Sequence, residues 1–496
     1  MKKNKKYSII RITQYFLLLF SVIQFIACAD LDQDFEDERY LSTNHFNTIS
    51  EAGGIVGLKS IDGAILSYFR DGESSTDEFG LKAVGLGMDL RGNDMDMSTS
   101  TWFGAYSRYD NILLTSGDNE FIWKFFYKVI KDSNEIINLV AENTDSDILI
   151  YKYKAHAYRA IAYFYLTRIY QHTRADNSVK AIPIDLGELT PNPKSTVGEL
   201  KKQILDDLTL AYNGLETYTR SSKEEVDASV VAAFLARYHL TYENWSDAEY
   251  YADIAMKVGS ISSDVAHGFD ELSLSETVWG AEVTSTTSEV YSSFFSHTSQ
   301  INDGYSGWNH FKTINSNLYD FIPATDKRKK WFADQEYPPG TIVVPNTWGH
   351  YRALPKYSSL KFIAHPGPGV FIGDYIYLRN TEFYLTKAEA LARQNKNGEA
   401  QQLLFDLNTT RDDSYVKSIK TGQDLIDEIL MYRRVELWGD GVDSFDMARN
   451  GVGLNRQDGR LNPVIPGGDL VIPALDYKMI FAIPQKEIDS NPNISN

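Results

Sequence analysis

The only cysteine of this 496-residue chain, Cys28, lies directly behind a stretch with the features of a secretory signal. Five basic residues occupy positions 2–11, an apolar run spans 15–26, and Ala27 precedes the cysteine. A basic start, an apolar centre and a small residue before the cleavage point are typical of a signal peptide. The run is shorter than the about 20 residues of a membrane-spanning helix. We therefore expect 1–27 to be removed and Cys28 to begin the mature chain.

A thiol directly after Ala27 resembles a bacterial lipobox, in which the cysteine is lipidated. Each buried CH₂ of an acyl chain stabilises membrane attachment by about 0.8 kcal/mol, so we predict that Cys28 carries a lipid anchor. The alternative is a secreted protein with an incidental free cysteine. Because this thiol is the only one, the chain has no disulfide framework, no cysteine-rich zinc site and no catalytic cysteine.

The mature chain is strongly acidic. Removing 1–27 lowers the number of Lys and Arg from 49 to 44 against 67 Asp and Glu, which gives a net charge of −23. Such a surface repels nucleic acid and anionic lipid headgroups, so we expect neither as a partner. Acidic residues crowd the segment 28–45, which we interpret as a solvated tether. This segment also resembles the acidic export signal of some surface lipoproteins.

Three carboxylates, Asp89, Asp94 and Asp96, lie close to Gly92 in one short segment. Ca²⁺ takes about six to eight oxygen ligands, and this segment supplies only part of that set. We expect a turn with solvated carboxylates, or carboxylates that hydrogen-bond sugar hydroxyls, with Ca²⁺ as the alternative. No other cofactor is indicated, because no His-x-x-x-His or equivalent helical metal-ligand spacing occurs.

A group of charges of both signs lies near the C-terminus and comprises Arg433, Arg434, Glu436, Asp446 and Arg449. We interpret it as a structural ion-pair cluster that holds the last helix to the others, rather than as an active site. His156 and His239 fall within predicted helices and are interpreted as packed or rim histidines.

No motif selects a catalytic site. The chain has no Gly-x-Ser-x-Gly elbow, and its Gly-x-Gly pairs at 85–87 and 451–453 lack the further glycine of a dinucleotide-binding loop. Glycoside hydrolysis needs two carboxylates about 5–10 Å apart, and no motif marks one pair among so many acidic residues. We therefore expect no enzyme, with a glycoside hydrolase as one alternative and a scaffold for a protein partner as another.

Helices must position these residues. Apolar residues recur with helical spacing at 121–141, 150–171, 196–217, 227–242, 246–258, 377–392, 400–407 and 422–438. The turns at 245–248 and 397–400 are equivalent, each with an alanine that lets two helices approach closely. This pattern resembles the tetratricopeptide helix-turn-helix. We predict a mostly α fold in which four irregular pairs of this kind form a scaffold.

Two segments interrupt the repeats. Residues 71–120 and 259–375 lack sustained helical spacing and are rich in Gly, Ser, Thr, Asp, Asn and Pro. Long irregular segments are uncommon unless they are functional or disordered, and the second one holds half of the eight tryptophans, which argues against disorder. We predict that these insertions carry the function.

Four segments, in this order, are similar to conserved stretches of the SusD/RagB family of outer-membrane nutrient-uptake lipoproteins: 153–165, 377–390, 432–447 and 480–493. The resemblance covers nearly the whole chain. It departs from the family at Asp440, Asp443 and Ser444, where Glu, Arg and Trp are usual, so we expect a rearranged ion-pair network there.

The resemblance implies a lipid-anchored protein at the surface of the outer membrane. It would bind a nutrient, commonly an oligo- or polysaccharide, and deliver it to a SusC-like TonB-dependent transporter. A sugar site needs flat aromatic rings flanked by Asp, Asn, Gln or Arg. By location and composition we predict ligand-binding residues in the two insertions, with a buried position as the alternative for Trp102 and Trp308: Asp94, Asp96, Trp102, Tyr106, Arg108, Tyr291, Asn302, Asp303, Tyr305, Trp308 and Asn309.

The predicted organisation is thus a signal peptide at 1–27, a tether at 28–45 and N-terminal repeats at 46–260, which enclose the insertion at 71–120. An aromatic-rich insertion at 261–375 would form the ligand face, and C-terminal repeats with the closing motif would occupy 376–496.

Overall fold

The computed structural model describes residues 51–496, except 74, 98–101, 144, 189–190, 289–290, 303, 345–349, 351, 365–370, 458–468 and 495–496. The predicted signal peptide, Cys28 and the acidic tether lie outside the described residues. The chain divides into two units, Met1–Gly54 and Ile55–Asn496, and only the first turn of α3 is described in the first of them.

The described part is mostly helical, which confirms the predicted fold class. None of its helices is long and apolar enough to cross a membrane. The helices are α3 (Glu51–Asp71), α4 (Gly80–Leu90), α5 (Gly104–Arg108), α6 (Gly117–Leu139), α7 (Ser146–Tyr170), α8 (Val197–Gly214), α9 (Ala228–Thr241), α10 (Trp245–Ala255), α11 (Phe294–Thr298), α12 (Ser316–Phe321), α13 (Asn380–Arg393), α14 (Asn397–Arg411), α15 (Gly422–Glu436), α16 (Asp443–Arg449) and α17 (Gln485–Ser490).

Short strands and 3-10 turns connect them. The strands are β1 (Met95–Met97), β2 (Lys180–Pro183), β3 (Lys194–Thr196), β4 (Thr277–Ala281), β5 (Lys312–Ile314), β6 (Tyr375–Arg379), β7 (Leu454–Asn455) and β8 (Val471–Ile472), and the 3-10 turns are η1 (Asp110–Ile112), η2 (Lys327–Trp331) and η3 (Tyr477–Met479).

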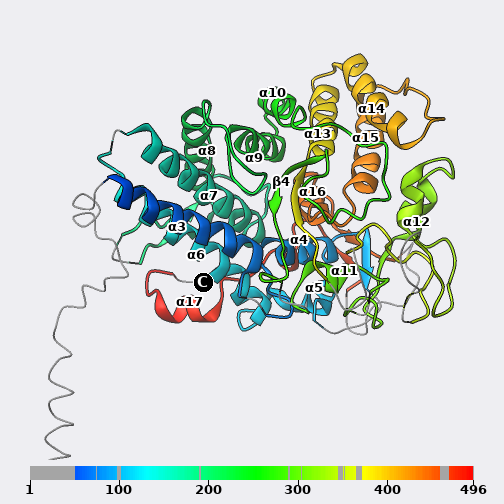
Figure 1. The fold of residues 1–496 in the computed structure, drawn as a ribbon, viewed down its shortest axis with the longest axis horizontal. Helices are drawn as coiled ribbons and strands as arrows, with labels where there is room; N and C mark the ends of the chain where they lie inside the picture. Colours follow the sequence, from blue (N-terminus) through cyan, green and yellow to red (C-terminus); the bar gives the residue numbers. More distant parts are fainter. Residues whose placement is uncertain are drawn as a thin grey trace, which may run out of the picture. The chain divides into compact units, whose positions relative to one another are not determined.

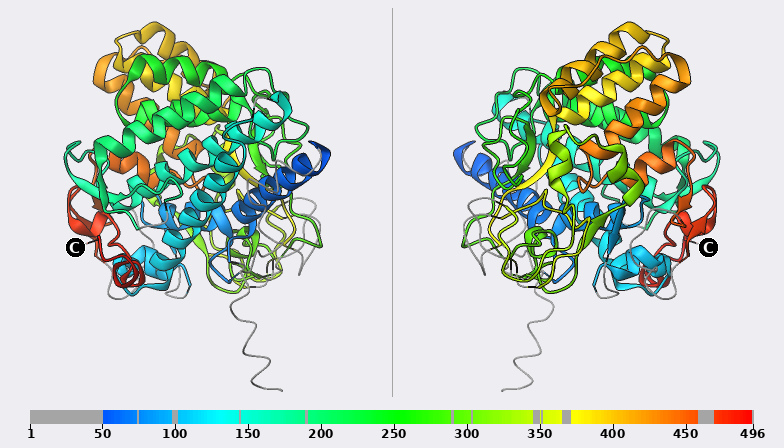
Figure 2. Two further views of the ribbon diagram at one scale, coloured as in Figure 1. Left: turned by 90° about the vertical axis from the view of Figure 1, so that its left-hand side faces the viewer. Right: turned by 90° about the vertical axis from the view of Figure 1, so that its right-hand side faces the viewer.

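Successive helices pack side by side from α6 to α10 and from α13 to α15, and α10 contacts α13, so the two runs form one array (Figures 1 and 2). The two segments predicted as equivalent turns, 245–248 and 397–400, form the first helical turns of α10 and α14, directly after the connections from α9 and α13. Ala248 and Ala400, in these first turns, are fully buried, as a close helix crossing requires.

Local signals explain where the helices begin. Thr196 and Glu199 form a capping box at the start of α8, and Asp227 accepts hydrogen bonds from two backbone N–H groups at the start of α9. Helix α7 packs against both α6 and α8. Its alanines at 155, 157, 160 and 162 are buried and leave room for these neighbours.

Some elements differ from the sequence-based prediction. Helices α4 and α5 lie inside the segment 71–120, where no helix is expected. Nearly all residues of α4 are buried, and three of its eleven residues are glycines, which are poor helix formers. Tyr377, predicted to begin a helix, belongs to strand β6. Short apolar runs do not distinguish a buried strand from a helix by their spacing.

The strands join segments that are far apart in the sequence. Strand β6, which leads directly into α13, pairs antiparallel with β4. Strand β1, from the first insertion, pairs antiparallel with β5, from the second, and Asp96 lies opposite Thr313. This pairing brings the two predicted ligand-binding insertions together.

A buried ion network connects the second insertion to the helical array. Glu436, at the end of α15, accepts hydrogen bonds from Arg328 at 3.1 Å, from Arg379 at 3.0 Å and from Arg411 at 2.9 Å. These three arginines come from η2, from β6 and from the end of α14. All four side chains are almost completely buried.

Further carboxylates balance the arginines. Asp326 pairs with Arg328, Glu276 pairs with Arg379 and Arg411, and Asp440 pairs with Arg379 and with Lys361. The network thus holds four cations and four anions. The neutral total matters because an unpaired charge in the interior costs several kcal/mol.

We expect Glu436→Gln to lower the free energy of unfolding by about 3–5 kcal/mol, because the change leaves three buried arginines with one carboxylate fewer. Denaturant unfolding followed by tryptophan fluorescence measures the effect. The control is Glu142→Gln, at an exposed position, for which we expect a change below about 0.5 kcal/mol. Equal midpoints for the two variants would contradict a central role for Glu436.

Candidate ligand-binding surface

Four rings from the two insertions form one cluster, which we call the aromatic surface: Trp102, Tyr291, Tyr305 and His310. The ring centroids of Trp102 and Tyr305 are 4.0 Å apart, and His310 meets Trp102 edge-on at 4.5 Å. Tyr291 lies 5.7 Å from Tyr305. Trp102 precedes α5, and the other three flank α11 or precede β5, so the β1–β5 pairing holds the cluster together.

The aromatic surface is partly open to solvent. The exposed fraction is 36% for Trp102 and 52% for Tyr291, which is unusual for large rings. Trp308 is 44% exposed, so neither predicted tryptophan is a core residue. Exposed rings that are fixed by ring neighbours can stack on the apolar C–H face of a sugar.

The backbone at Trp102 is held in an uncommon conformation. Its φ of 46° lies in the left-handed region, which bulky residues rarely adopt. Phe103, the next residue, is completely buried and contacts Phe79 and His297. The anchored neighbour thus maintains the strained turn that presents the Trp102 ring, and such strain concentrates at functional sites.

His297 packs against the aromatic surface from the protein interior. It is buried, and its ring lies 4.9 Å from Tyr305 and stacks on Phe79 at 5.5 Å. Its Nε2 donates to the Thr76 carbonyl at 2.7 Å. Burial lowers the pKa of His297 well below its usual value, so the imidazole is neutral at physiological pH.

His310 is also neutral, because burial and the neighbouring Lys312 lower its pKa to about 4. The aromatic surface therefore carries no charge of its own at pH 7. Charged and polar groups lie beside it: the Arg352 guanidinium is 5.1 Å from the Trp308 ring, and Asn309 is exposed. His310 and Arg352 were not among the predicted residues. His310 joins the site through its contact with the Trp102 ring, and Arg352 through its contact with the Trp308 ring.

The structure places four predicted ligand residues in the interior. Tyr106 is 1% exposed and fills the space above Gly87, where a Cβ would lie 2.4 Å from its ring. Asn302 is buried and accepts a hydrogen bond from Ser299. Asp94 and Asp96 are buried as well, so the expected turn with solvated carboxylates is wrong.

The two remaining predicted residues are Arg108, which pairs with Asp110 at 2.5 Å, and Asp303, which lies outside the described residues.

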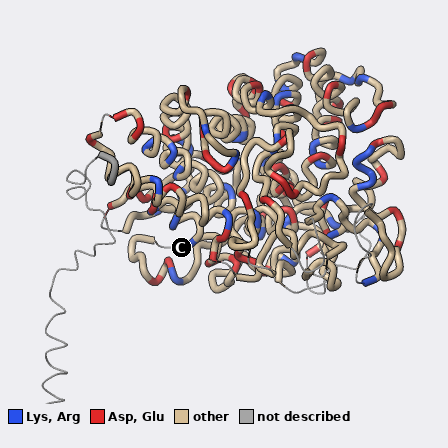
Figure 3. The backbone as a smooth tube through the Cα atoms, in the orientation of Figure 1, with Lys and Arg blue, Asp and Glu red and all other residues tan. Residues whose placement is uncertain are grey.

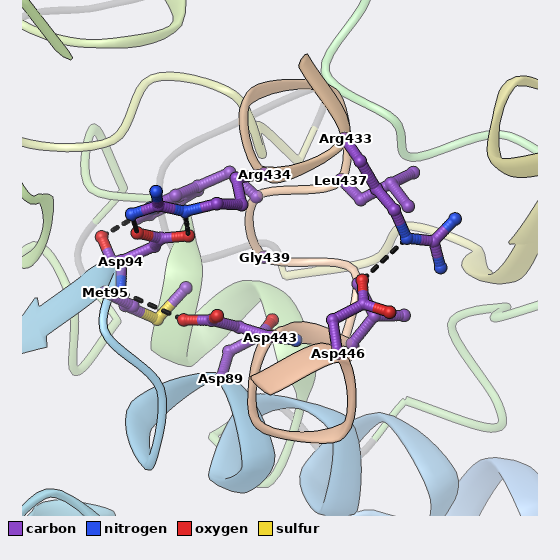
Figure 4. Close-up of a pocket in the computed structure, with 11 residues that line it drawn as sticks. Asp89, Asp94, Met95, Arg433, Arg434, Leu437, Gly439, Asp443 and Asp446 are labelled. Atoms are coloured by element: carbon purple, nitrogen blue, oxygen red, sulfur yellow. Dashed lines mark hydrogen bonds and ion pairs between the residues drawn. The ribbon is translucent and has the colours of Figure 1, made fainter. Parts of the chain in front are cut away.

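Asp89 and Asp94 belong to a charged junction between α4, β1, α15 and α16 (Figure 4). Asp94 forms a bidentate pair with Arg434, and its backbone N–H donates to Asp443 at 2.9 Å. Asp89 accepts the backbone N–H groups of Gly441 and Asp443, at the start of α16. The pocket between these residues measures about 20 Å³, which is room for one water molecule and not for a sugar.

Protonation differs within the junction. Burial raises the pKa of Asp89 to about 7. Burial also acts on Asp446, but Arg433 and Arg449 outweigh it and lower its pKa to about 2. Arg433 and Arg449 each contact Asp446 at 2.6 Å, and Arg449 also pairs with Glu389 of α13. Of the predicted ion-pair cluster, Arg433, Asp446 and Arg449 thus pair with one another and tie α16 to the array, whereas Arg434 pairs with Asp94 and Glu436 with the buried network of the fold.

His156 and His239 are packed, as predicted. His156 lies 2.7 Å from the Asp207 carboxylate, and His239 stacks on Tyr251 at 5.6 Å. Among the described residues, no group of three or more His, Cys, Asp or Glu side chains has the arrangement of a metal site.

Two family models match the sequence. The model described as the SusD family matches residues 372–496, and the model described as starch-binding associating with outer membrane matches 86–240. No curated protein sequence matches the chain.

Solved structures share the fold. A SusD-like carbohydrate binding protein from Bacteroides vulgatus is 23% identical, with a TM-score of 0.76, over 89% of this chain and 97% of the other. A SusD superfamily protein from Bacteroides thetaiotaomicron is 22% identical, with a TM-score of 0.72, over 89% and 99% of the two chains.

The lowered pKa of Asp446 gives a pH dependence that can be measured. A carboxyl whose pKa is lower in the folded state stabilises the fold above its unfolded pKa of about 4, and this contribution is lost as the pH falls toward about 2. We expect Asp446→Asn to be less stable than the wild type by about 2–3 kcal/mol at pH 6 and the gap to narrow below about pH 4. Urea unfolding across this range tests the expectation, and a gap that widens in acid would contradict it.

Proposed function

Because this chain belongs to the SusD/RagB family, we propose that it binds an oligo- or polysaccharide on the aromatic surface and delivers it to a SusC-like TonB-dependent transporter. In this proposal Cys28 carries a lipid anchor, and the protein lies at the outer face of the outer membrane. The protein binds the glycan and passes it on without breaking bonds.

The contact between Trp102 and Tyr305 carries the proposal. The two ring centroids are 4.0 Å apart, the rings come from different insertions, and Trp102 is held in a strained turn. Both side chains are partly exposed to solvent. Sugar rings have apolar C–H faces that suit such surfaces, and their hydroxyl edges suit polar neighbours. Arg352 and Asn309 supply such neighbours beside Trp308.

The neutral histidines are consistent with this chemistry. His297 and His310 have lowered pKa values and add no cation beneath the rings. A surface of this kind selects for ring shape and hydroxyl pattern more than for ligand charge. The family model that matches 86–240, described as starch-binding associating with outer membrane, supports the same ligand class and the same location.

We expect Trp102→Ala to weaken binding of a neutral oligosaccharide by about 1–3 kcal/mol, the range of an exposed aromatic that dominates a contact. The melting temperature should change little, because this ring buries only part of its surface. Tyr106→Ala should do the opposite and cost about 3–5 kcal/mol of stability, since Tyr106 is a core residue. Calorimetric titration and thermal unfolding of both variants measure the two effects.

The matched control is Tyr250→Ala, which removes an exposed ring of α10 that is not part of the aromatic surface. Its affinity should equal that of the wild type. The ligand for the comparison is first selected by titrating the wild type with starch, xylan, pectin and glycosaminoglycan fragments. If Trp102→Ala binds the selected glycan as the wild type does, the assignment of the aromatic surface is wrong.

We expect Cys28→Ala to leave the folded domain intact and to shift it from the membrane fraction to the soluble fraction, because acyl chains provide the attachment. Fractionation of cells that express each form, followed by a high-salt wash, measures the distribution. A variant that stays in the membrane fraction after this wash would contradict the lipid anchor.

A further inference from the structure

A second cavity lies on the second insertion, in residues that the aromatic surface does not use. It is a cleft of about 750 Å³ between η2, the segment 263–266 and the segment 333–344. This volume falls in the range of about 300–1,000 Å³ that is typical of small-molecule sites. The pockets beside the charged junction measure only about 20 Å³ each.

The cleft is basic although the chain is acidic. Three lysines of η2, Lys327, Lys329 and Lys330, line it, against two carboxylates, Asp264 and Asp334. The whole sequence has a net charge of −18. In Figure 3, Lys and Arg gather beside the position of α12, whereas both signs alternate over the helical array.

Two of these lysines have no carboxylate partner among the described residues. The Lys329 ammonium donates to the carbonyls of Tyr319 and Ile322 at 3.2 and 2.7 Å and lies 4.3 Å from the Tyr319 ring. Lys330 is exposed and forms no hydrogen bond or ion pair with a described residue. Lys327 differs from both, because its ammonium lies 3.4 Å from Asp413.

The walls of the cleft are partly apolar, and hydrogen bonds connect their segments. The Trp331 indole N–H donates to the Val265 carbonyl at 2.6 Å, and the Tyr337 hydroxyl donates to Asp334 at 2.5 Å. Arg328, between the lysines in the sequence, is buried and fully paired with Asp326 and Glu436. The ion network of the fold therefore holds η2 in place, and with it the lysines.

We propose that this cleft is a second ligand site, which takes an oligosaccharide with anionic substituents, either uronate carboxylates or sulfate esters. Lys329 and Lys330 would meet the anionic groups, and the partly exposed side chains of Tyr337 and Val343 would meet the sugar faces. Ammonium groups form strong charge-assisted hydrogen bonds with carboxylate and sulfate oxygens. The saccharide nature of the ligand rests on the proposed function, whereas its charge rests on the cleft alone.

The test uses charge reversal at Lys330, which touches no described partner, so that the fold is preserved. We expect Lys330→Glu to weaken binding of oligogalacturonate or a heparin-derived oligosaccharide at least about tenfold, and Lys330→Arg to retain it. The control is Lys131→Glu, which makes the same change in net charge at an exposed position of α6 and should stay within about twofold of the wild type. Titration calorimetry of the purified protein gives all four affinities.

The two anionic probes distinguish carboxylate from sulfate, and Trp102→Ala separates the two sites, since it should weaken neutral glycans and spare the cleft. The inference is overturned if no anionic oligosaccharide binds, or if both charge reversals weaken binding equally. Polyglutamate serves as a third probe. The inference is also overturned if Lys330→Glu weakens binding of polyglutamate but not binding of an anionic oligosaccharide. Loss of neutral glycan binding in Trp102→Ala together with unchanged anionic binding in Lys330→Glu would reject the cleft and retain the proposed function.

Discussion

The fold depends on one buried carboxylate, Glu436, which accepts hydrogen bonds from three arginines of three different elements. Burial opposes its ionisation, but Arg411, Arg379 and Arg328 outweigh burial and hold its pKa well below the usual value. Apolar contacts have no preferred direction, whereas the buried charges of this network are all paired in only one arrangement of the elements. We infer that the network fixes the orientation of the second insertion on the helices, a role that buried ion pairs have in some other proteins.

From this network a chain of contacts leads to the aromatic surface. Arg434, two residues before Glu436, donates two hydrogen bonds to the Asp94 carboxylate. Asp94 directly precedes β1. Strand β1 pairs with β5, which follows His310, and β1 leads toward the turn that presents Trp102. Helix α15 thus positions rings that are more than a hundred residues away in the sequence. Asp94 therefore has a positioning role at the site, although it is buried and no ligand can reach it.

Sequence patterns predicted the elements whose signals are local. The helices α9, α10, α13 and α14 were predicted from apolar residues at helical spacing and from a short turn, and both features are encoded locally. Helix α4 was missed, because three of its eleven residues are glycines. Glu436 was predicted to be part of a structural ion-pair cluster, but with neighbours close in the sequence. Its partners Arg328 and Arg379 come from distant segments and carry no local mark.

The same limit applies to the site. Trp102 and Tyr106 are four residues apart and equally aromatic, and only the neighbouring Gly87 explains why one ring is buried and the other exposed.

The aromatic surface and the cleft beside η2 suit ligands of different charge: the first suits neutral glycans and the second anionic ones. Around the aromatic surface the imidazoles are neutral, so affinity there depends on ring contacts, which salt hardly affects. An anionic polymer approaching the protein meets a net repulsion, but charges farther away than the Debye length of about 8 Å contribute little at physiological ionic strength. Within that distance, the three lysines of η2 outnumber Asp264 and Asp334, the two carboxylates that line the cleft. An acidic protein can therefore hold an acidic glycan where lysines gather, and the buried pairs of Arg328 hold the η2 backbone that carries them.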